Sequence, residues 1–254
     1  MKHIASCSCG KDSLAMVYKL IDEHYPLDEI VFYDTGMEFD SIYNNWEKLK
    51  SYAQLHNIKC VTLKPKCPFL YTMFEHPHTS RKDGVTRYGY SWCGGKCRWG
   101  TREKLVAIDK YCEKENAFCY VGIAYDETQR LMKERKSYKL FPLSDWKMTE
   151  QDCLKYCRSK GISWIEKCTS LAEIEFYIDL YNILDRVSCW CCANKNLWEL
   201  YNYWKYLPDY WNRLKELQSK TSRPFNSRYS IFDLEERFSN GYIPKHRKKS
   251  KETT

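Results

Sequence analysis

The sequence HIASCSCGKDSLAMVYKLI, at residues 3–21, determines the architecture of this chain more than any other segment. Residues 3–8 form an apolar run, Cys9 and Gly10 interrupt it, and apolar side chains then recur at helical spacing through Leu20 and Ile21. These patterns predict a strand, a tight turn and a helix in direct succession. The backbone amides at the start of such a helix point into the turn, where they favour binding of an anion.

The following residues alternate between strand and helix patterns. Strands are expected at 29–34, 59–63, 117–124 and 138–143, and helices at 39–55, 98–111 and 150–157. The alternation predicts an α/β fold with a doubly wound, mostly parallel sheet and a C-terminal helical extension. The 117–124 strand is the most apolar and is expected at the centre of the sheet. Ligands of such sheets bind beyond the carboxyl ends of the strands.

Three parts are expected along the chain. Residues 1–195 form the sheet domain, 196–222 form amphipathic helices packed on it, and 223–254 form a tail with a basic, mobile end. Within the first part, residues 65–90 contain prolines, histidines and a polar run, so a long loop or lid is expected there.

Composition limits the class of protein. A chain of 254 residues with 43% hydrophobic residues can bury one large domain or two small ones. It has no apolar run near the ~18 residues of a membrane helix and no apolar stretch of a secretory signal at its start, so a cytoplasmic protein without a membrane partner is expected. The net charge of +8 favours an anionic partner, which nucleotide, nucleic acid or acidic protein would each satisfy.

The turn at the start of the first helix carries the residue types of a phosphate site. Gly10 allows backbone amides to approach a phosphate, Lys11 can neutralise its oxygens and Ser13 can donate a hydrogen bond. An ordinary turn between strand and helix with exposed polar residues is the alternative.

Four segments in the same order carry a family resemblance. The segment S-x-G-K-D-S at 8–13 resembles the PP-loop of the adenine nucleotide α-hydrolase superfamily. The segment DTGMEF at 34–39 is similar to the N-T-G-x-x-F segment of its phosphoadenosine phosphosulfate (PAPS) reductase-like branch. The segments GIAYDETQR at 122–130 and PLSDWKMT at 142–149 resemble two further elements of that branch. The resemblance spans about residues 3–192 and implies that ATP or another adenine nucleotide binds with Mg²⁺ at the strand ends.

The resemblance also assigns roles to residues. It implies a catalytic role for Lys11, Asp12 and Arg130, and nucleotide binding by Ser8, Cys9, Gly10, Lys11, Asp12, Ser13, Asp34, Thr35, Gly36, Gly122 and Glu127. Asp12 or Asp34 would hold Mg²⁺, although Asp12 could equally cap a helix. Cys9 replaces the commoner second glycine of the loop, which a negative φ would tolerate. Ala124 replaces an arginine, which makes recognition of a sulfonucleotide doubtful.

Cysteines form a second candidate site. The chain has 14, and the pairs Cys93 with Cys97 and Cys189 with Cys192 have the spacing of metal ligands. Cys191 could replace either member of the second pair. The resemblance to cluster-bearing relatives favours a [4Fe-4S] cluster, and Zn²⁺ is the alternative. Most of the other cysteines fall in helices and strands, where a free cysteine is a small buried apolar residue.

No cysteine follows Cys192, so the C-terminal nucleophile of true sulfonucleotide reductases is absent. The expected activity is therefore cleavage of ATP at the α-phosphate to adenylate an acceptor, by a transferase of sulfur metabolism. The acceptor is unknown and could be a nucleic acid or a small molecule, and a sulfur donor or partner protein could assist. One alternative is a sulfonucleotide reductase that uses Cys7, Cys67 or Cys191. Another is a nonenzymatic, metal-stabilised module that binds nucleotide or nucleic acid, for which the basic tail at 245–251 is a candidate contact.

Overall fold

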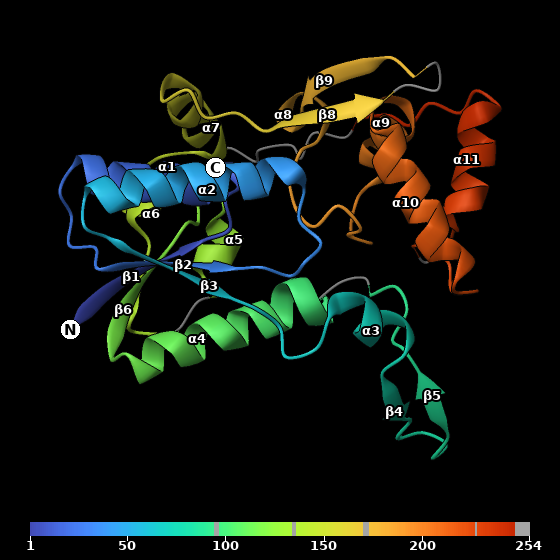
Figure 1. Ribbon diagram of the computed structural model, residues 1–254, viewed down its shortest axis with the longest axis horizontal. Helices are drawn as coiled ribbons and strands as arrows, with labels where there is room; N and C mark the ends of the chain where they lie inside the picture. Colours follow the sequence, from blue (N-terminus) through green and yellow to red (C-terminus); the bar gives the residue numbers. More distant parts are fainter. Residues whose placement is uncertain (94–96, 134–135, 170–172, 227, 247–254) are drawn as a thin grey trace. The chain divides into compact units, whose positions relative to one another are not determined.

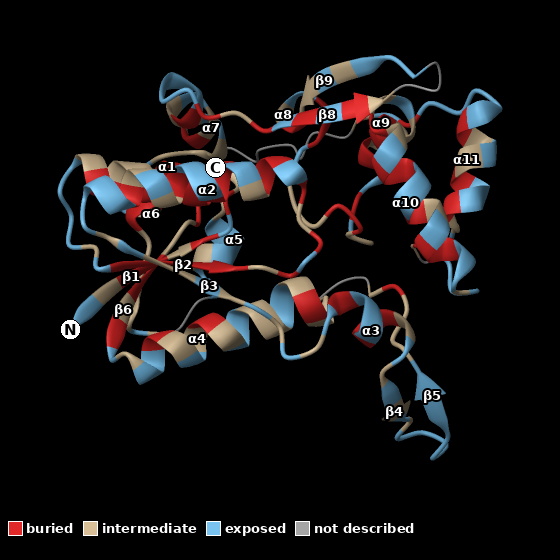
Figure 2. Ribbon diagram, in the orientation of Figure 1, coloured by how far each residue is buried: buried red, intermediate tan, exposed pale blue. Residues whose placement is uncertain are grey.

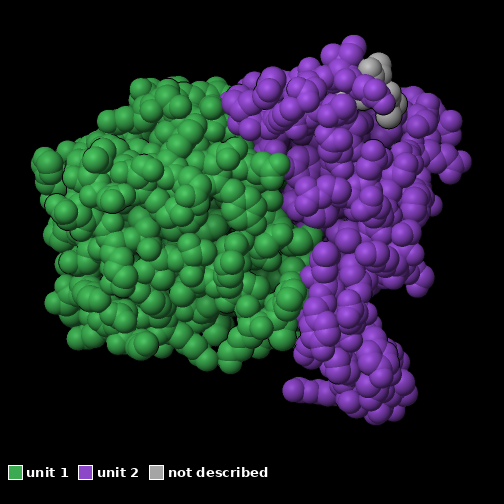
Figure 3. Space-filling view, in the orientation of Figure 1, with its two compact units in different colours: residues 1–69, 97–164 green, residues 70–96, 165–254 purple. Residues whose placement is uncertain are grey.

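The computed structural model describes residues 1–93, 97–133, 136–169, 173–226 and 228–246. The chain forms two compact units, one of residues 1–69 with 97–164 and one of residues 70–96 with 165–254 (Figure 3). A compact unit is not necessarily a part that folds alone, so the domain boundaries expected from the sequence stay a prediction.

The first unit contains a five-stranded parallel sheet (Figure 1). Its strands are β1 (Lys2–Cys7), β2 (Glu29–Tyr33), β3 (Lys59–Leu63), β6 (Ala117–Val121) and β7 (Lys139–Leu140). They lie in the order β3-β2-β1-β6-β7, so the chain winds outward from β1 in both directions. The predicted doubly wound α/β fold is confirmed. The expectation for 117–124 needs one correction, because β6 is an interior strand and β1 occupies the centre.

Helices cover both faces of this sheet (Figure 1). The helices α1 (Lys11–Asp22), α2 (Asp40–Leu55) and α7 (Glu150–Ser159) lie on one face, and α4 (Lys104–Lys114) lies on the other. Ile108 and Cys112 of α4 pack against apolar side chains of β1, β2 and β6. Figure 2 shows the buried residues concentrated on the strands and on the helix faces that meet them. Each fully buried aliphatic side chain contributes about 1.5–3 kcal/mol to such a core.

Two predicted elements of the first unit differ in detail. The helix expected from residue 98 begins with a π-helical segment, η1 (Arg98–Glu103), in which the amide of Arg102 donates to the carbonyl oxygen of Cys97 at 3.0 Å. The strand expected at 138–143 ends early, because Pro142 cannot donate to a sheet and instead begins the short helix α6 (Pro142–Asp145). The helix α5 (Thr128–Leu131) completes this unit.

The start of α7 is fixed by a local motif. Thr149 and Asp152 form a reciprocal capping box, in which the amide of Asp152 donates to the Thr149 hydroxyl at 3.2 Å and the amide of Thr149 donates to the Asp152 carboxylate at 3.1 Å. The box fixes the first turn of α7, which matters for the candidate site.

The second unit contains several elements that the sequence patterns did not indicate. Residues 65–90 were expected to form a loop but contain α3 (Phe69–Phe74) and an antiparallel hairpin of β4 (Pro77–Thr79) and β5 (Thr86–Tyr88). A second hairpin joins β8 (Ile165–Thr169) to β9 (Glu175–Asp179), followed by α8 (Leu180–Ile183). These elements are too short to show a clear period.

The C-terminal helices match the prediction in part. The two amphipathic helices α9 (Leu197–Tyr206) and α10 (Pro208–Ser219) are confirmed. The expected tail contains a third helix, α11 (Ile231–Ser239), which begins with a capping box of Ser230 and Asp233. The end of the basic segment, residues 247–254, lies outside the described residues. Across the described ranges, every helix is too short or too polar to cross a membrane.

Candidate active site

The candidate site lies at the switch point of the sheet, at the end of β1, which has β2 as its neighbour on one side and β6 on the other. The turn at 8–10 follows the carboxyl end of β1, and Gly122 follows the carboxyl end of β6. Ligands of doubly wound sheets bind at this position. The topology therefore brings two of the predicted motifs to one place.

Gly122 allows these two motifs to approach each other closely. A Cβ atom at this position would lie 3.0 Å from Cα and 3.1 Å from the amide nitrogen of Ser13 in α1. Contacts this short are tighter than ordinary van der Waals contact, so the backbone of α1 would have to move by a few tenths of an ångström to admit a Cβ atom. Space therefore favours glycine here, which gives Gly122 a packing role beside its predicted role in the nucleotide site.

The side chain of Ser13 stabilises the turn from inside. Its hydroxyl accepts a hydrogen bond from the amide of Ser8 at 3.1 Å and donates to the carbonyl oxygen of Gly10 at 3.1 Å. The hydroxyl oxygen of Ser8 lies 3.2 Å from the hydroxyl oxygen of Ser13. Ser13 thus shapes the loop, and its bond to a phosphate stays a prediction.

Cys9 adopts a backbone conformation that was not expected. Its φ is 56°, in the left-handed region where glycine is common, so the expectation of a negative φ is wrong. The indole N–H of Trp164 donates to the carbonyl oxygen of Cys9 at 2.7 Å, and both residues are fully buried. Burial also raises the pKa of the Cys9 thiol. The surrounding core therefore supports a conformation that the residue alone disfavours.

Lys11 lies between two carboxylates. Its Nζ is 3.0 Å from Oδ2 of Asp12 and 3.0 Å from Oε1 of Glu150, and its side chain is only 7% exposed. The amide of Glu150 donates to the carboxylate of Asp126 at 2.9 Å, which adds to the capping box at the start of α7. The sequence motif indicated Lys11 and Asp12 but not Glu150, because only tertiary packing of α7 on α1 brings Glu150 here.

Burial disfavours the charged form of the Asp12 carboxyl group. Burial raises its pKa to about 6, against the opposing attraction of Lys11. Its Oδ1 is buried without a hydrogen-bond partner among the described residues. The N-cap of α1 is Gly10, and no side chain caps it, so the alternative of Asp12 as a helix cap is wrong. A carboxylate oxygen in this position suits a hard cation such as Mg²⁺.

The turn after β2 is held by the side chains of Asp34 and Thr35. The Asp34 carboxylate accepts from the Gly36 amide and from the Tyr43 hydroxyl, each at 2.8 Å. The Thr35 hydroxyl accepts from the Met37 amide at 3.2 Å, and Gly36 has a φ of 77° that favours glycine. Asp34 therefore has a structural task, and Asp12 is the better candidate for the cation.

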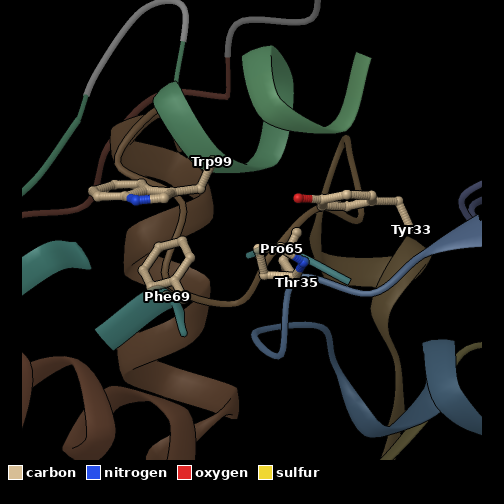
Figure 4. Close-up of a pocket in the computed structure, with 5 residues that line it drawn as sticks. All are labelled: Tyr33, Thr35, Pro65, Phe69 and Trp99. Carbon is tan, nitrogen blue, oxygen red and sulfur yellow. The ribbon is translucent and has the colours of Figure 1, made fainter. Parts of the chain in front are cut away.

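A small apolar pocket adjoins this turn (Figure 4). Its walls are Tyr33, Thr35, Pro65, Phe69 and Trp99. The rings of Phe69 and Trp99 are in contact, with centroids 4.5 Å apart and planes inclined by 43°. Thr35 belongs both to the pocket and to the predicted nucleotide-binding turn, so the two features are continuous.

The motif after β6 forms its own ion pair. Arg130 Nη1 lies 2.6 and 2.7 Å from the two carboxylate oxygens of Glu127, and the Arg130 side chain is 57% exposed. The Ala124 amide donates to the same carboxylate at 3.3 Å. Arg130 would have to leave Glu127 to hold a phosphate, so its catalytic role stays a prediction.

The four cysteines of the second candidate site all lie in the described part of the chain. Cys189 and Cys192 are half-buried and joined by a turn, in which the amide of Cys192 donates to the carbonyl oxygen of Cys189 at 3.1 Å. Cys191 is 3% exposed and points into the core. Cys93 and Cys97 are half-buried, and residues 94–96 between them lie outside the described residues. The described part of the chain gathers no group of three or more side chains fit for a metal, so the four-cysteine site stays a prediction.

Comparison with known proteins gives a family match for the N-terminal segment. Residues 2–89, which include the phosphate loop and the turn after β2, match the phosphoadenosine phosphosulfate (PAPS) reductase domain. The match covers the motifs at 8–13 and 34–39, so the resemblance seen in these two motifs is confirmed.

Two further comparisons were made with the whole chain. An uncharacterized protein of Methanocaldococcus jannaschii is 24% identical over 232 residues, which are 86% of this chain but 42% of that protein. This chain thus spans less than half the length of that relative. The U34-tRNA thiolase NcsA from Methanococcus maripaludis, solved with its [4Fe-4S] cluster, is similar over 94% of this chain and 71% of its own, at 14% identity and a TM-score of 0.43.

Proposed function

We propose that this protein is a PP-loop enzyme that binds ATP with Mg²⁺, cleaves it between the α- and β-phosphates and adenylates an acceptor. A nucleophilic sulfur donor then attacks the adenylated acceptor, a nucleic acid or a small molecule, and AMP leaves. The observation that carries the proposal is the buried ammonium group of Lys11 beside the amide end of α1, within residues that match a PAPS reductase domain.

The geometry supports a phosphate at this corner of the sheet. The first amides of α1 have no carbonyl partner within the helix and carry partial positive charge. Lys11 adds a full positive charge, which can stabilise the negative charge that develops on the departing pyrophosphate. Positioning and electrostatic stabilisation supply most of the rate in phosphoryl transfer, so the loop needs no nucleophile of its own. Asp12 is the residue that would hold Mg²⁺, because its Oδ1 is buried and accepts no hydrogen bond within the described part of the chain.

The cysteines are the proposed ligands of a [4Fe-4S] cluster or Zn²⁺. Thiolates suit either metal centre, and the turn from Cys189 to Cys192 leaves both of its end thiols half-buried. Such a centre would supply a site at which sulfur is handled. The residues of the phosphate loop act independently of it.

Burial of the candidate thiols speaks against the sulfonucleotide reductase alternative. Cys7 has no exposed surface and Cys191 is 3% exposed, so neither thiolate can reach a bound nucleotide without rearrangement of the core. Cys67 is half-buried and is the remaining candidate of the three. A reductase would release sulfite from a sulfonucleotide in the presence of thioredoxin, and a Cys67→Ser variant would be inactive.

The test of the proposed function is the position of ATP cleavage. Protein purified without oxygen is incubated with Mg²⁺, ATP labelled at the α- or γ-phosphate, and candidate RNA, DNA and small-molecule acceptors. We expect release of pyrophosphate and transfer of labelled AMP to one acceptor, both lost in Lys11→Met and kept in Lys19→Met on the same helix. Release of orthophosphate, or binding of ATP without turnover with any acceptor, would contradict the proposal, the latter in favour of a binding module.

A further inference from the structure

Lys11 is neutralised before any nucleotide arrives. Its Nζ lies 3.0 Å from a carboxylate oxygen of Asp12 and 3.0 Å from one of Glu150, so one positive charge is paired with two carboxylates. A phosphate that binds Lys11 has to compete with both acids. Asp12 is the direct neighbour of Lys11 and is given by the loop motif, whereas Glu150 comes from a distant part of the chain.

The backbone of Glu150 is held firmly opposite the loop. It is the first residue of α7, its amide is bonded to Asp126, and the capping box of Thr149 and Asp152 fixes the turn. Farther along α7, the thiol of Cys157 donates to the carbonyl oxygen of Lys11 at 3.3 Å. The Glu150 side chain itself is 42% exposed and can turn away from Lys11 without disturbing the core.

We infer that Glu150 makes nucleotide binding depend on a divalent cation, by competing with the phosphates of ATP for Lys11. This inference rests on the proposed function. Metal-free ATP carries more negative charge than its Mg²⁺ complex, so it is repelled more strongly by an uncompensated carboxylate at this corner. The cation complex meets less repulsion and can draw Lys11 away from Glu150. Glu150 is thus a positioning residue that selects the cation complex of ATP over free ATP.

The test measures the dissociation constant of ATP with excess chelator and with Mg²⁺, by calorimetry on the purified full chain. In Glu150→Gln we expect binding of metal-free ATP to strengthen about fivefold, and the gain from Mg²⁺ to shrink by the same factor. Glu23→Gln is the matched control, because Glu23 is also 42% exposed and also pairs with a lysine, Lys19 of α1. Glu150→Asp keeps the charge and should keep the dependence on Mg²⁺.

Each outcome has a distinct meaning. An unchanged ratio of the two dissociation constants in Glu150→Gln, with ATP still bound by the wild type, would overturn the inference and leave the proposed function standing. Equal weakening of binding in chelator and in Mg²⁺ would also overturn it, since a merely structural role changes both alike. If the wild type binds ATP under neither condition, the proposed function itself fails.

Discussion

Single residues of the phosphate loop take up conformations and charges that their surroundings impose. Cys9 lies in the left-handed region because the core holds its backbone, and Asp12 keeps a raised pKa because α7 covers it. Lys11 is buried with its charge balanced by two acids. Such local costs, each of order 1–3 kcal/mol, are typical of functional sites. They give the candidate site properties that single substitutions can test.

Trp164 is predicted to support the phosphate loop through one hydrogen bond. Replacement Trp164→Phe leaves the buried carbonyl of Cys9 without a partner, which should lower the free energy of unfolding by about 1–3 kcal/mol. The affinity for ATP should fall with it, because the loop loses its support. Urea denaturation and calorimetry measure the two effects.

Trp46→Phe is the matched control for this prediction. Its indole N–H donates to the hydroxyl of Thr62 at 3.1 Å, in a buried position on the helix α2. This variant should lose stability but keep its affinity for ATP. Equal losses of affinity in the two variants would show that Trp164 has no particular link to the loop.

The raised pKa of Asp12 predicts how stability depends on pH. The folded protein holds the proton of Asp12 more tightly than the unfolded chain, so this carboxyl stabilises the fold below its ordinary pKa of 3.8, and the contribution is lost as pH rises through about 6. Asp12→Asn removes the titration. The stability of the wild type relative to this variant should therefore fall by about 1 kcal/mol from about pH 5 to about pH 7, as measured by urea denaturation.

The pKa of Asp22 is shifted in the opposite direction from that of Asp12, so its effect on stability has the opposite dependence on pH. Burial opposes ionisation of Asp22, but bonds from Lys160, Tyr156 and Tyr52 hold its pKa below the ordinary value. The stabilisation from Asp22 is therefore present above its ordinary pKa and is lost at lower pH.

The Asp12 prediction has a clear contradicting outcome. If the stability of the wild type relative to Asp12→Asn were the same at the two pH values, Asp12 would not be buried as described.

At the scale of elements, the central feature is the close approach of the end of β6 to the start of α1. Gly122→Ala places a methyl group 3.0 Å from the backbone of Ser13, so the phosphate loop must shift. We expect ATP affinity to fall at least about tenfold, with stability lowered by about 1–3 kcal/mol. Gly84→Ala is the control, since it introduces backbone strain at a positive φ in open space, outside the candidate site. Normal ATP affinity in Gly122→Ala would contradict the packing described.

The turn from Cys189 to Cys192 predicts which cysteines hold a metal centre. Cys192→Ala should remove the iron and the broad absorption near roughly 400 nm of protein purified without oxygen, whereas Cys191→Ala should keep both, because Cys191 lies in the core. Iron and zinc analysis of both variants makes the measurement. Loss of the metal centre in Cys191→Ala but not in Cys192→Ala would show that Cys191 is the ligand. Zinc without iron in the wild type would show that the centre is Zn²⁺ and not a cluster.

The sequence was sufficient for elements with a strong period and for motifs that lie within one turn. The strands and helices of residues 3–63 and the loop around Lys11 were predicted within a few residues of their bounds. The short hairpins and α3 were not, since three to six residues show no period. Glu150 and Trp164 were missed because their contacts with the loop join residues about 140 to 155 positions apart in sequence. Such contacts depend on tertiary packing, which no local pattern encodes.

At the scale of the whole molecule, the parallel sheet unit supplies the phosphate loop, the cation candidate Asp12 and the apolar pocket. The second unit supplies helices, two hairpins and the cysteine turn at 189–192. The net charge of +8 is consistent with an anionic substrate beyond ATP.

Calorimetric titration of the full chain with ATP in the presence of Mg²⁺ tests most directly whether the loop after β1 is a nucleotide site. We predict one ATP bound per chain, with binding lost in Lys11→Met while the circular dichroism spectrum and unfolding transition stay those of a folded protein. Absence of binding by the folded wild type, or equal affinity in Lys11→Met, would contradict the account.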